Sequence, residues 1–149
     1  MTQLAVFFHI VAAILLVGGT ISVTMLAVAA RAAPDLERRR AIVMLSRPFE
    51  RMTTLAVPTA IVTGLVTLVL FGYSIMSVWV LATGVVLLVM VAIQVLHWNR
   101  MGPRVHDALE RGDDAAAVEL MRDPRSVTLG RVEVGLSFLT VALMVFRPG

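Results

Sequence analysis

The chain has 149 residues, of which 58% are hydrophobic and only 15% are charged, and its mean hydropathy is +0.88. Soluble domains usually have about a quarter charged residues, so this composition excludes a soluble globular domain. Cysteine is absent, which excludes disulfides, thiolate-held iron–sulfur or zinc sites and cysteine nucleophiles. We therefore expect a single integral membrane domain over residues 1–149.

The first expected span, residues 4–30, contains one ionisable residue, His9. It lies in an uncharged run over residues 2–30, longer than the roughly 20 apolar residues that cross a bilayer. The helix face that carries His9 is mostly small, which favours close packing against other helices. His9 is then either a packed, hydrogen-bonded residue or a ligand of haem iron or copper. In the second case Met144 or Met76 would be the other ligand.

Two hydrophilic segments contain almost all the positive charge. Twelve of the thirteen arginines lie in residues 31–51 and 99–131. Because cytoplasmic loops are enriched in basic residues, we expect both segments in the cytoplasm and both termini outside, in a bacterial cytoplasmic membrane. Residues 35–47 read as a short basic helix at the membrane interface or as a solvated connector. The orientation of the chain in the membrane explains why arginines gather in these two segments, so no nucleic-acid partner is expected.

The second and third spans, residues 52–71 and 75–98, are joined by a very short turn and should be antiparallel neighbours. On the second span, threonines repeat every four residues beside a glycine, a pattern of close packing with interhelical hydrogen bonds (Thr59, Thr63, Gly64 and Thr67). Tyr73, Trp79 and Trp98 at the ends of the third span match the aromatic belts of the two membrane interfaces.

The only sizeable hydrophilic loop covers residues 99–126. Gly102 and Pro103 predict the start of a helix and Gly112 its end. Asp113 or Asp114 would cap the start of a second short helix, and Asp123 and Pro124 would end that helix.

The fourth span, residues 127–146, contains Glu133 about two turns from its start. A carboxylate inside a span is costly unless it is paired or faces a cavity, so Glu133 is a functional candidate. Together with Gln94 and His97 it would form a proton- or ion-handling cluster near the inner end of the bundle. The alternative is a structural pair with Arg131 or a neighbouring loop arginine.

These inner residues and His9 should lie at different depths. His9 is close to the outer end of its span, whereas His97 and Glu133 are close to the inner ends of theirs. Much of the roughly 30 Å apolar core would separate His9 from His97, so the two histidines cannot share one haem iron or one metal ion.

Both ends of the chain carry motifs of a known family. In the first span, six residues separate His9 from a Leu-Val-Gly-Gly motif that ends at Gly19. The chain finishes in Met-Val-Phe-Arg-Pro-Gly. The sequence resembles an uncharacterised bacterial family of small predicted integral membrane proteins. In that family the first helix has the form His…Leu-Trp-Val-Gly-Gly and the chain ends in Met-Val-x-Lys-Pro-Gly. Leu16 stands where a tryptophan is common, and Arg147 replaces the usual lysine.

More distantly, the first helix is similar to those of the copper-resistance D membrane domain and the HemJ-type protoporphyrinogen oxidases. In the oxidases a first-helix histidine is associated with haem b, and this resemblance would place haem b on His9. Those enzymes also rely on a lysine later in the chain. This sequence contains no lysine, so the resemblance does not extend to the oxidase activity.

The sequence therefore predicts an all-α bundle of four transmembrane helices with short cytoplasmic interfacial helices. Three functions stay open. The protein is a haem- or copper-binding component of a redox or metal-handling system, a non-catalytic accessory subunit, or a proton-coupled carrier that uses Glu133. The expected partners are the lipid bilayer and either a second copy of the chain in a homodimer or the subunits of a larger membrane complex. A carrier of this size would need a dimer to enclose a pathway. No catalytic nucleophile, phosphate loop or acid–base pair is visible, so an enzyme is not expected.

Overall fold

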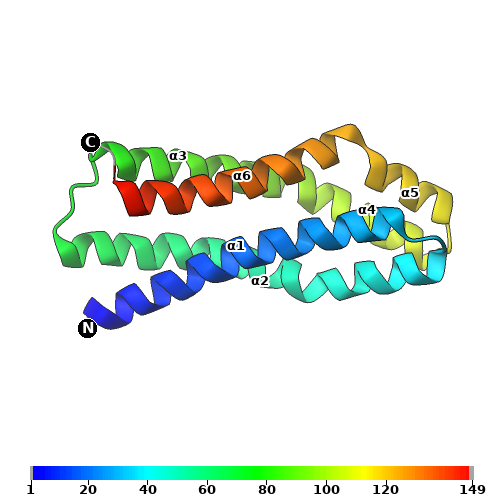
Figure 1. Cartoon of the computed structure of the whole chain (residues 1–149), viewed down its shortest axis with the longest axis horizontal. Coiled ribbons are helices and arrows are strands. Elements are labelled where there is room, and N and C mark those ends of the chain that lie inside the picture. The colour runs from blue at the N-terminus through cyan, green and yellow to red at the C-terminus, as the bar shows by residue number, and fades with distance from the viewer. Residues whose placement is uncertain (1, 148–149) are drawn as a thin grey trace.

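Long helices account for nearly all of the computed structural model, which describes residues 2–147 (Figure 1). The last two residues of the C-terminal motif, Pro148 and Gly149, lie outside this range. In chain order the elements are α1 (Thr2–Ala32), α2 (Leu36–Phe71), α3 (Val78–Ile93), the π-helical turn η1 (Gln94–Trp98), α4 (Asn99–Glu110), α5 (Asp114–Arg122) and α6 (Pro124–Phe146). The all-α prediction is confirmed.

Four helices are long and apolar enough to cross a membrane. They cover Gln3–Ala32, Leu36–Phe71, Val78–Glu110 and Pro124–Phe146, and they form one bundle. Both described chain ends and the α2–α3 turn lie at one end of this bundle, and α4 and α5 lie at the other (Figure 1). The expected four-helix transmembrane bundle is therefore confirmed.

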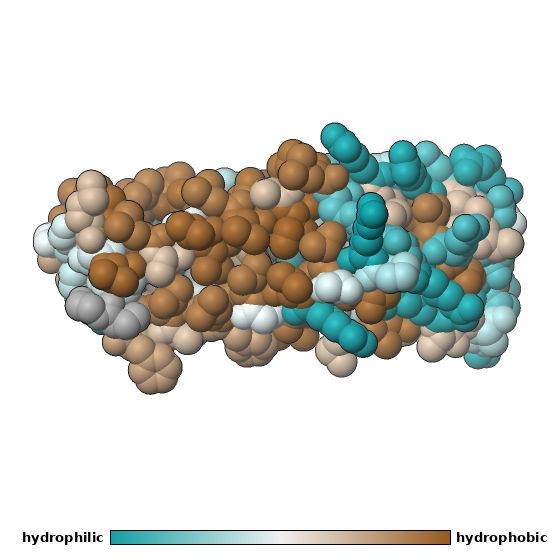
Figure 2. All heavy atoms as spheres, turned by 90° about the horizontal axis from the view of Figure 1, so that it is seen from above, coloured by the Kyte–Doolittle hydropathy of each residue, from teal (hydrophilic) through white to brown (hydrophobic). Residues whose placement is uncertain are grey.

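The surface changes character along the long axis of the molecule. On the face shown in Figure 2, apolar side chains predominate over the half toward the described chain ends, and hydrophilic side chains gather over the half that contains α4 and α5. The apolar half exposes large residues such as Phe7, Ile14 and Leu55 to the outside. Because lipid tails are as apolar as these side chains, this half is suited to lie in the bilayer.

The basic segment before the second span does not form the separate interfacial helix that the sequence suggested. It is the first part of α2, a continuous helix of 36 residues. At a rise of about 1.5 Å per residue this helix is about 54 Å long, so it extends well beyond a core of roughly 30 Å. Leu36 and Val43, which suggested contact with lipid, pack instead against a buried cluster of residues from α1, α4 and α5 (Ala30, Ala108, Leu109, Ala117 and Met121).

The third span also continues without a break. The predicted helix start at Gly102 and Pro103 is wrong, because α3, η1 and α4 form one helix from Val78 to Glu110. The following boundaries agree with the sequence. Gly112 ends α4 with a φ of +75°, and the Asp113 carboxylate accepts a hydrogen bond from Ala116 N at the start of α5.

Helix α1 packs extensively against α2, whereas α3 packs against α6 over a smaller contact, similar to the one that α6 makes with α1. Helices α2 and α3 run antiparallel, as expected, but they meet only through side chains of the core and not by close backbone packing. The side chains that meet between the two pairs form an apolar core around Leu16, Ala56, Leu87 and Met90. The bundle therefore consists of two helix pairs that meet along this core.

Arg39 anchors the hydrophilic half. Its side chain is buried, with 5% of the residue exposed. Nε donates a hydrogen bond to the Ala30 carbonyl at 3.1 Å, and Nη2 donates to the Ala33 carbonyl at 2.6 Å. Nη1 forms an ion pair with Asp114 at the start of α5. One side chain thus satisfies carbonyls left free where α1 ends and connects α1, α2 and α5.

Arg147 closes the opposite end of the bundle. Its guanidinium carbon lies 4.9 Å from the centroid of the Tyr73 ring and 5.7 Å from that of Trp79, and it donates a hydrogen bond to the Tyr73 hydroxyl. These cation–π contacts connect the end of α6 to the α2–α3 turn. Trp79 therefore lies at this end of the bundle.

Candidate functional site

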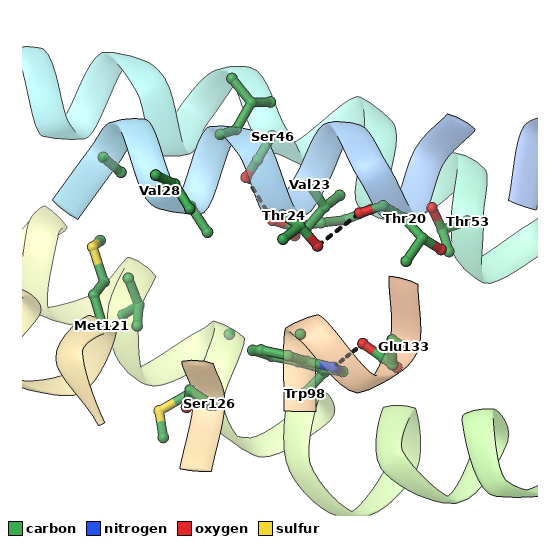
Figure 3. A pocket seen from close by; sticks show the side chains of 18 of the residues that line it. Thr20, Val23, Thr24, Val28, Ser46, Thr53, Trp98, Met121, Ser126 and Glu133 are labelled. Carbon is green, nitrogen blue, oxygen red and sulfur yellow. Dashed lines mark hydrogen bonds between the residues drawn. The ribbon is translucent and has the colours of Figure 1, made fainter. Parts of the chain in front are cut away.

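A cavity of about 300 Å³ lies between the helix pairs, where the apolar half of the bundle meets the hydrophilic half. Residues from all four long helices line it, together with Leu120 and Met121 of α5. In Figure 3, Thr20, Thr24 and Thr53 lie on the wall formed by α1 and α2, and Trp98 and Glu133 lie on the opposite wall. A concave, mostly apolar space with a few polar groups is the usual form of a small-molecule site.

Glu133 lies on the wall of this cavity. Its Oε2 accepts a hydrogen bond of 2.6 Å from the indole Nε1 of Trp98. No arginine among the described residues forms an ion pair with it, so the structural pair with Arg131 that the sequence left open is not formed. The carboxylate therefore has a single protein partner and faces a cavity.

The π-helical turn η1 explains how Trp98 reaches Glu133. A π turn inside an α-helix adds one residue and rotates the side chains that follow, and such turns are frequent at functional sites. The turn contains Gln94, His97 and Trp98. The sequence suggested Trp98 as a residue of the lipid interface, but its polar edge points into the protein at Glu133. Sequence periodicity could not reveal this rotation, because it assumes a regular helix.

The predicted cluster of Glu133, Gln94 and His97 is only partly assembled. Gln94 lines the cavity with Glu133, but its amide donates to Asn99 at 3.3 Å. His97 does not line the cavity, and its Nε2 lies 2.9 Å from the Ser126 hydroxyl. His97 thus reaches the cavity only through Ser126.

Glu50 is a cavity residue that the sequence analysis missed. Its Oε1 accepts a hydrogen bond of 2.5 Å from Ser46, and its Oε2 lies 3.8 Å from Nε2 of His106 on α4. In the sequence, Glu50 lies between the basic segment and the second expected span, where a charged residue does not by itself indicate a functional site. Only the continuity of α2 brings this carboxylate into the cavity.

Two arginines complete the polar lining. Arg31 near the end of α1 donates from Nε to the Met121 carbonyl at 2.7 Å, and Arg131 lies on α6. Both residues line the cavity and carry a positive charge. The cavity wall therefore carries two cationic and two acidic side chains.

Asp123 caps the N-terminal end of α6. Its carboxylate accepts hydrogen bonds from the Ser126 backbone N at 3.1 Å and from the Ser126 hydroxyl at 3.0 Å. Loss of solvent around the carboxyl raises its pKa, but these hydrogen bonds and the nearby His97 outweigh that effect and lower the pKa of Asp123 below its ordinary value of 3.8. Asp123 thus caps α6 as an anion and positions Ser126 toward His97.

This cap predicts a pH dependence of stability. A carboxyl group with a lowered pKa in the folded state stabilises the fold at every pH above the unfolded value, and that stabilisation is lost as the pH falls through the folded value. We expect the thermal midpoint of detergent-solubilised protein to fall more between pH 5 and about pH 3 in the wild type than in Asp123→Asn. Asparagine still caps a helix but does not titrate. Equal slopes for the two proteins would contradict this role.

His9 lies apart from the cavity. Its Nδ1 is 3.2 Å from the Thr63 hydroxyl on α2, and a Cβ built on Gly64 would lie 3.0 Å from its Cε1. Along α1, His9 is about 16 Å from Thr20 at a rise of about 1.5 Å per residue. Glycine at position 64 therefore lets the imidazole pack directly against α2, and His9 and Glu133 belong to different sites.

The residues around His9 do not form a ready ligand pair for haem or copper. The imidazole is turned toward α2, whereas Met144 belongs to α6, and Met76 is 77% exposed in the α2–α3 turn. In the described part of the chain, no group of three or more His, Cys, Asp or Glu side chains could hold a metal ion. Helix packing explains His9 here, and haem or copper at this residue stays a prediction.

The comparison with protein families gave one finding. The family model described as "Predicted integral membrane protein (DUF2269)" matches residues 3–148. The comparisons with curated proteins and with solved structures gave no match. The match covers nearly the whole bundle, including α1 with His9 and α6 with Glu133. The chain is a small polytopic membrane protein that belongs to the DUF2269 family of predicted integral membrane proteins.

Proposed function

We propose that this protein is a proton-coupled carrier that holds a small amphipathic molecule in the cavity between its helix pairs. The observation that carries the proposal is the Glu133 carboxylate on the cavity wall, with Trp98 as its hydrogen-bond partner. Ionisable residues inside spans that face a cavity are characteristic of proton relays in pumps and transporters. Glu133 would bind and release the coupled proton.

The cavity suits a molecule with an apolar and a polar part. Leu16, Val57 and Met90 line it toward the apolar core, and Glu50, Arg31 and Arg131 line it toward the hydrophilic half. This arrangement would bury an apolar tail beside the core and leave a polar head beside the charged residues. The volume of about 300 Å³ corresponds to a small ligand or to the head and first carbons of a larger one.

The packing of the helices supports a carrier rather than a purely structural subunit. Helix α1 packs extensively on α2, α3 packs on α6, and the cavity lies between these pairs, which also meet through α1 and α6. Alternating access in many transporters is the rocking of one such unit against another around a fixed site. One chain forms this cavity by itself, so a dimer is not needed to build the binding site.

Charge distribution supports a cytoplasmic position for the cavity end of the bundle. The arginine-rich segments 31–51 and 99–131 form the hydrophilic half, and the positive-inside rule favours the cytoplasm for them. Both termini and the cluster of Arg147, Tyr73 and Trp79 would then face the other side. In this orientation the cavity would exchange protons with the cytoplasm.

The test is proton flux in proteoliposomes that contain trapped pyranine. Hexyl phosphate, hexyltrimethylammonium and hexyl glucoside offer one tail with an anionic, a cationic and a neutral head. We expect an inward gradient of at least one of them to drive proton flux in the wild type. Because glutamine keeps the hydrogen bond from Trp98 but does not titrate, Glu133→Gln should abolish the coupled flux while the protein still folds.

Glu119→Gln provides the matched control, because Glu119 is an exposed glutamate on α5 outside the central cavity. Its proton flux should equal that of the wild type. Proton flux that persists at the wild-type rate in Glu133→Gln, or the absence of flux with all three probes, would refute the carrier.

A further inference from the structure

We infer that Arg31 and Arg131 form a binding site for the anionic head group of the cavity ligand, a phosphate attached to an apolar tail. This inference rests on the proposed function for the use of the cavity, and it adds the chemical class of the ligand. The two arginines come from different helices, α1 and α6, and both line the cavity. No sequence motif relates them.

The arginines of the cavity are not held in ion pairs by its acidic residues. Among the residues that the structure describes, neither guanidinium forms an ion pair with a carboxylate. The acidic groups of the cavity have other partners, since Glu133 accepts from Trp98 and Glu50 accepts from Ser46. An anion in the cavity would be attracted by the positive charge of both arginines. Arginine is the side chain best suited to bind phosphate oxygens in pairs.

The route to the cavity suits an amphiphile. Val28 of α1 lines the cavity and is 55% exposed at the same time, so the cavity reaches the molecular surface next to Arg31. This surface lies near the boundary between the apolar and hydrophilic halves, where the head groups of lipids would be. The apolar wall around Leu16 and Met90 continues inward from the arginine pair. A tail would lie on this wall or leave the cavity at Val28.

The acidic residues link this site to protons. With Glu133 and Glu50 both ionised, the charges of the cavity cancel. Protonation of Glu133 leaves the arginine pair in excess, so an anion binds more tightly at lower pH and enters together with a proton. The charged or titratable groups near Glu133 are Arg31 from α1, Glu50 from α2 with His106 from α4 beside it, and Arg131 on α6 itself.

The experiment measures probe binding to the detergent-purified protein by tryptophan fluorescence. The chain has two tryptophans, so Trp79→Phe leaves Trp98 on the cavity wall as the only one. Titration calorimetry of the unsubstituted protein provides a second readout. We expect hexyl phosphate to bind and hexyltrimethylammonium, which has the same tail, to bind at least about tenfold more weakly, as for the loss of one charge-assisted hydrogen bond.

Arg131→Gln is the decisive variant, because Arg31 also supports the α5 carbonyl of Met121. It should weaken hexyl phosphate binding by about tenfold. Arg125→Gln, an exposed arginine on the same helix outside the cavity, should change the affinity by less than about twofold. Equal affinity for the anionic and cationic probes, or unchanged affinity in Arg131→Gln, overturns the inference.

Two further arms separate this inference from the proposed carrier and identify the source of the anion. Glu133→Gln should bind hexyl phosphate at neutral pH at least as tightly as the wild type, although it does not couple protons. If a cationic or neutral probe alone drives proton flux, the carrier stands and the arginine site falls. In nanodiscs, competition by phosphatidylglycerol but not by phosphatidylcholine identifies a bilayer lipid. Equal binding of hexyl phosphate in nanodiscs of either lipid identifies a soluble phosphate ester as the ligand. Inorganic phosphate alone should bind weakly, because it lacks the tail.

Discussion

Replacement of Arg39 by alanine should destabilise the protein by about 3 kcal/mol, the largest effect that we expect of a single substitution. Arg39 is 5% exposed and donates to the carbonyls of Ala30 and Ala33. Alanine would leave the Ala33 carbonyl without its side-chain donor, the Ala30 carbonyl with only the Ala33 backbone N, and Asp114 without its cation. Buried polar groups that lose their partner cost the full loss of hydration, so the penalty exceeds the strength of one hydrogen bond.

The measurement is the loss of ellipticity at 222 nm during SDS titration of protein in dodecylmaltoside. Arg38→Ala is the matched control, because the Arg38 side chain is 73% exposed and pairs only with Asp35 in the preceding turn. Exposed ion pairs contribute about 0–1 kcal/mol. If Arg38→Ala and Arg39→Ala unfold at the same SDS fraction, Arg39 does not anchor the hydrophilic half.

Gly19→Ala should destabilise the α1–α2 pair by about 1–3 kcal/mol, as overpacked cores do. A Cβ at this position would lie 2.2 Å from Oγ1 of Thr53, which no two atoms tolerate without movement. The Thr53 hydroxyl donates to the Phe49 carbonyl at 2.9 Å, and a β-branched side chain has few alternative rotamers. The helices must therefore separate, and because Thr53 lines the cavity, the cavity will change shape.

The neighbouring glycine supplies the control. Nothing lies within 4 Å of a Cβ built on Gly18, so Gly18→Ala should leave stability unchanged or raise it, since alanine favours a helix over glycine. Thr53→Ala in the Gly19→Ala background removes the clashing oxygen and should restore most of the loss. Equal unfolding of Gly18→Ala and Gly19→Ala, or no rescue by Thr53→Ala, would show that this contact does not limit helix packing.

Much of the fold could be predicted because it depends on local sequence. A long apolar run must form a helix in lipid, since every backbone polar group needs a partner within the segment. The helix ends at Gly112 and Asp113 follow from the backbone preferences of glycine and aspartate alone. Helix continuity could not be predicted in the same way. Pro48 and Pro103 suggest boundaries, but both lie inside longer helices whose apolar residues are covered by other helices.

The candidate site could be predicted only in part. Glu133 stands out because a charge inside a span is rare, and the sequence alone identified it. Its partner Trp98 and the second carboxylate, Glu50, could not be found, because they depend on the π turn and on the length of α2. Arg31 and Arg131 are indistinguishable in the sequence from the other arginines that flank the spans.

The sequence by itself determined that this protein is a bundle of four apolar helices with its charge at one end. These properties follow from hydropathy and charge, which act residue by residue. Only the tertiary structure decided which helices pair, which arginine is buried and which side chains meet in the cavity. Close contact of His9 with Gly64 and of Trp98 with Glu133 depends on residues far apart in the chain. Such contacts result from shape and hydrogen bonding between helices, for which a single sequence has no periodic pattern.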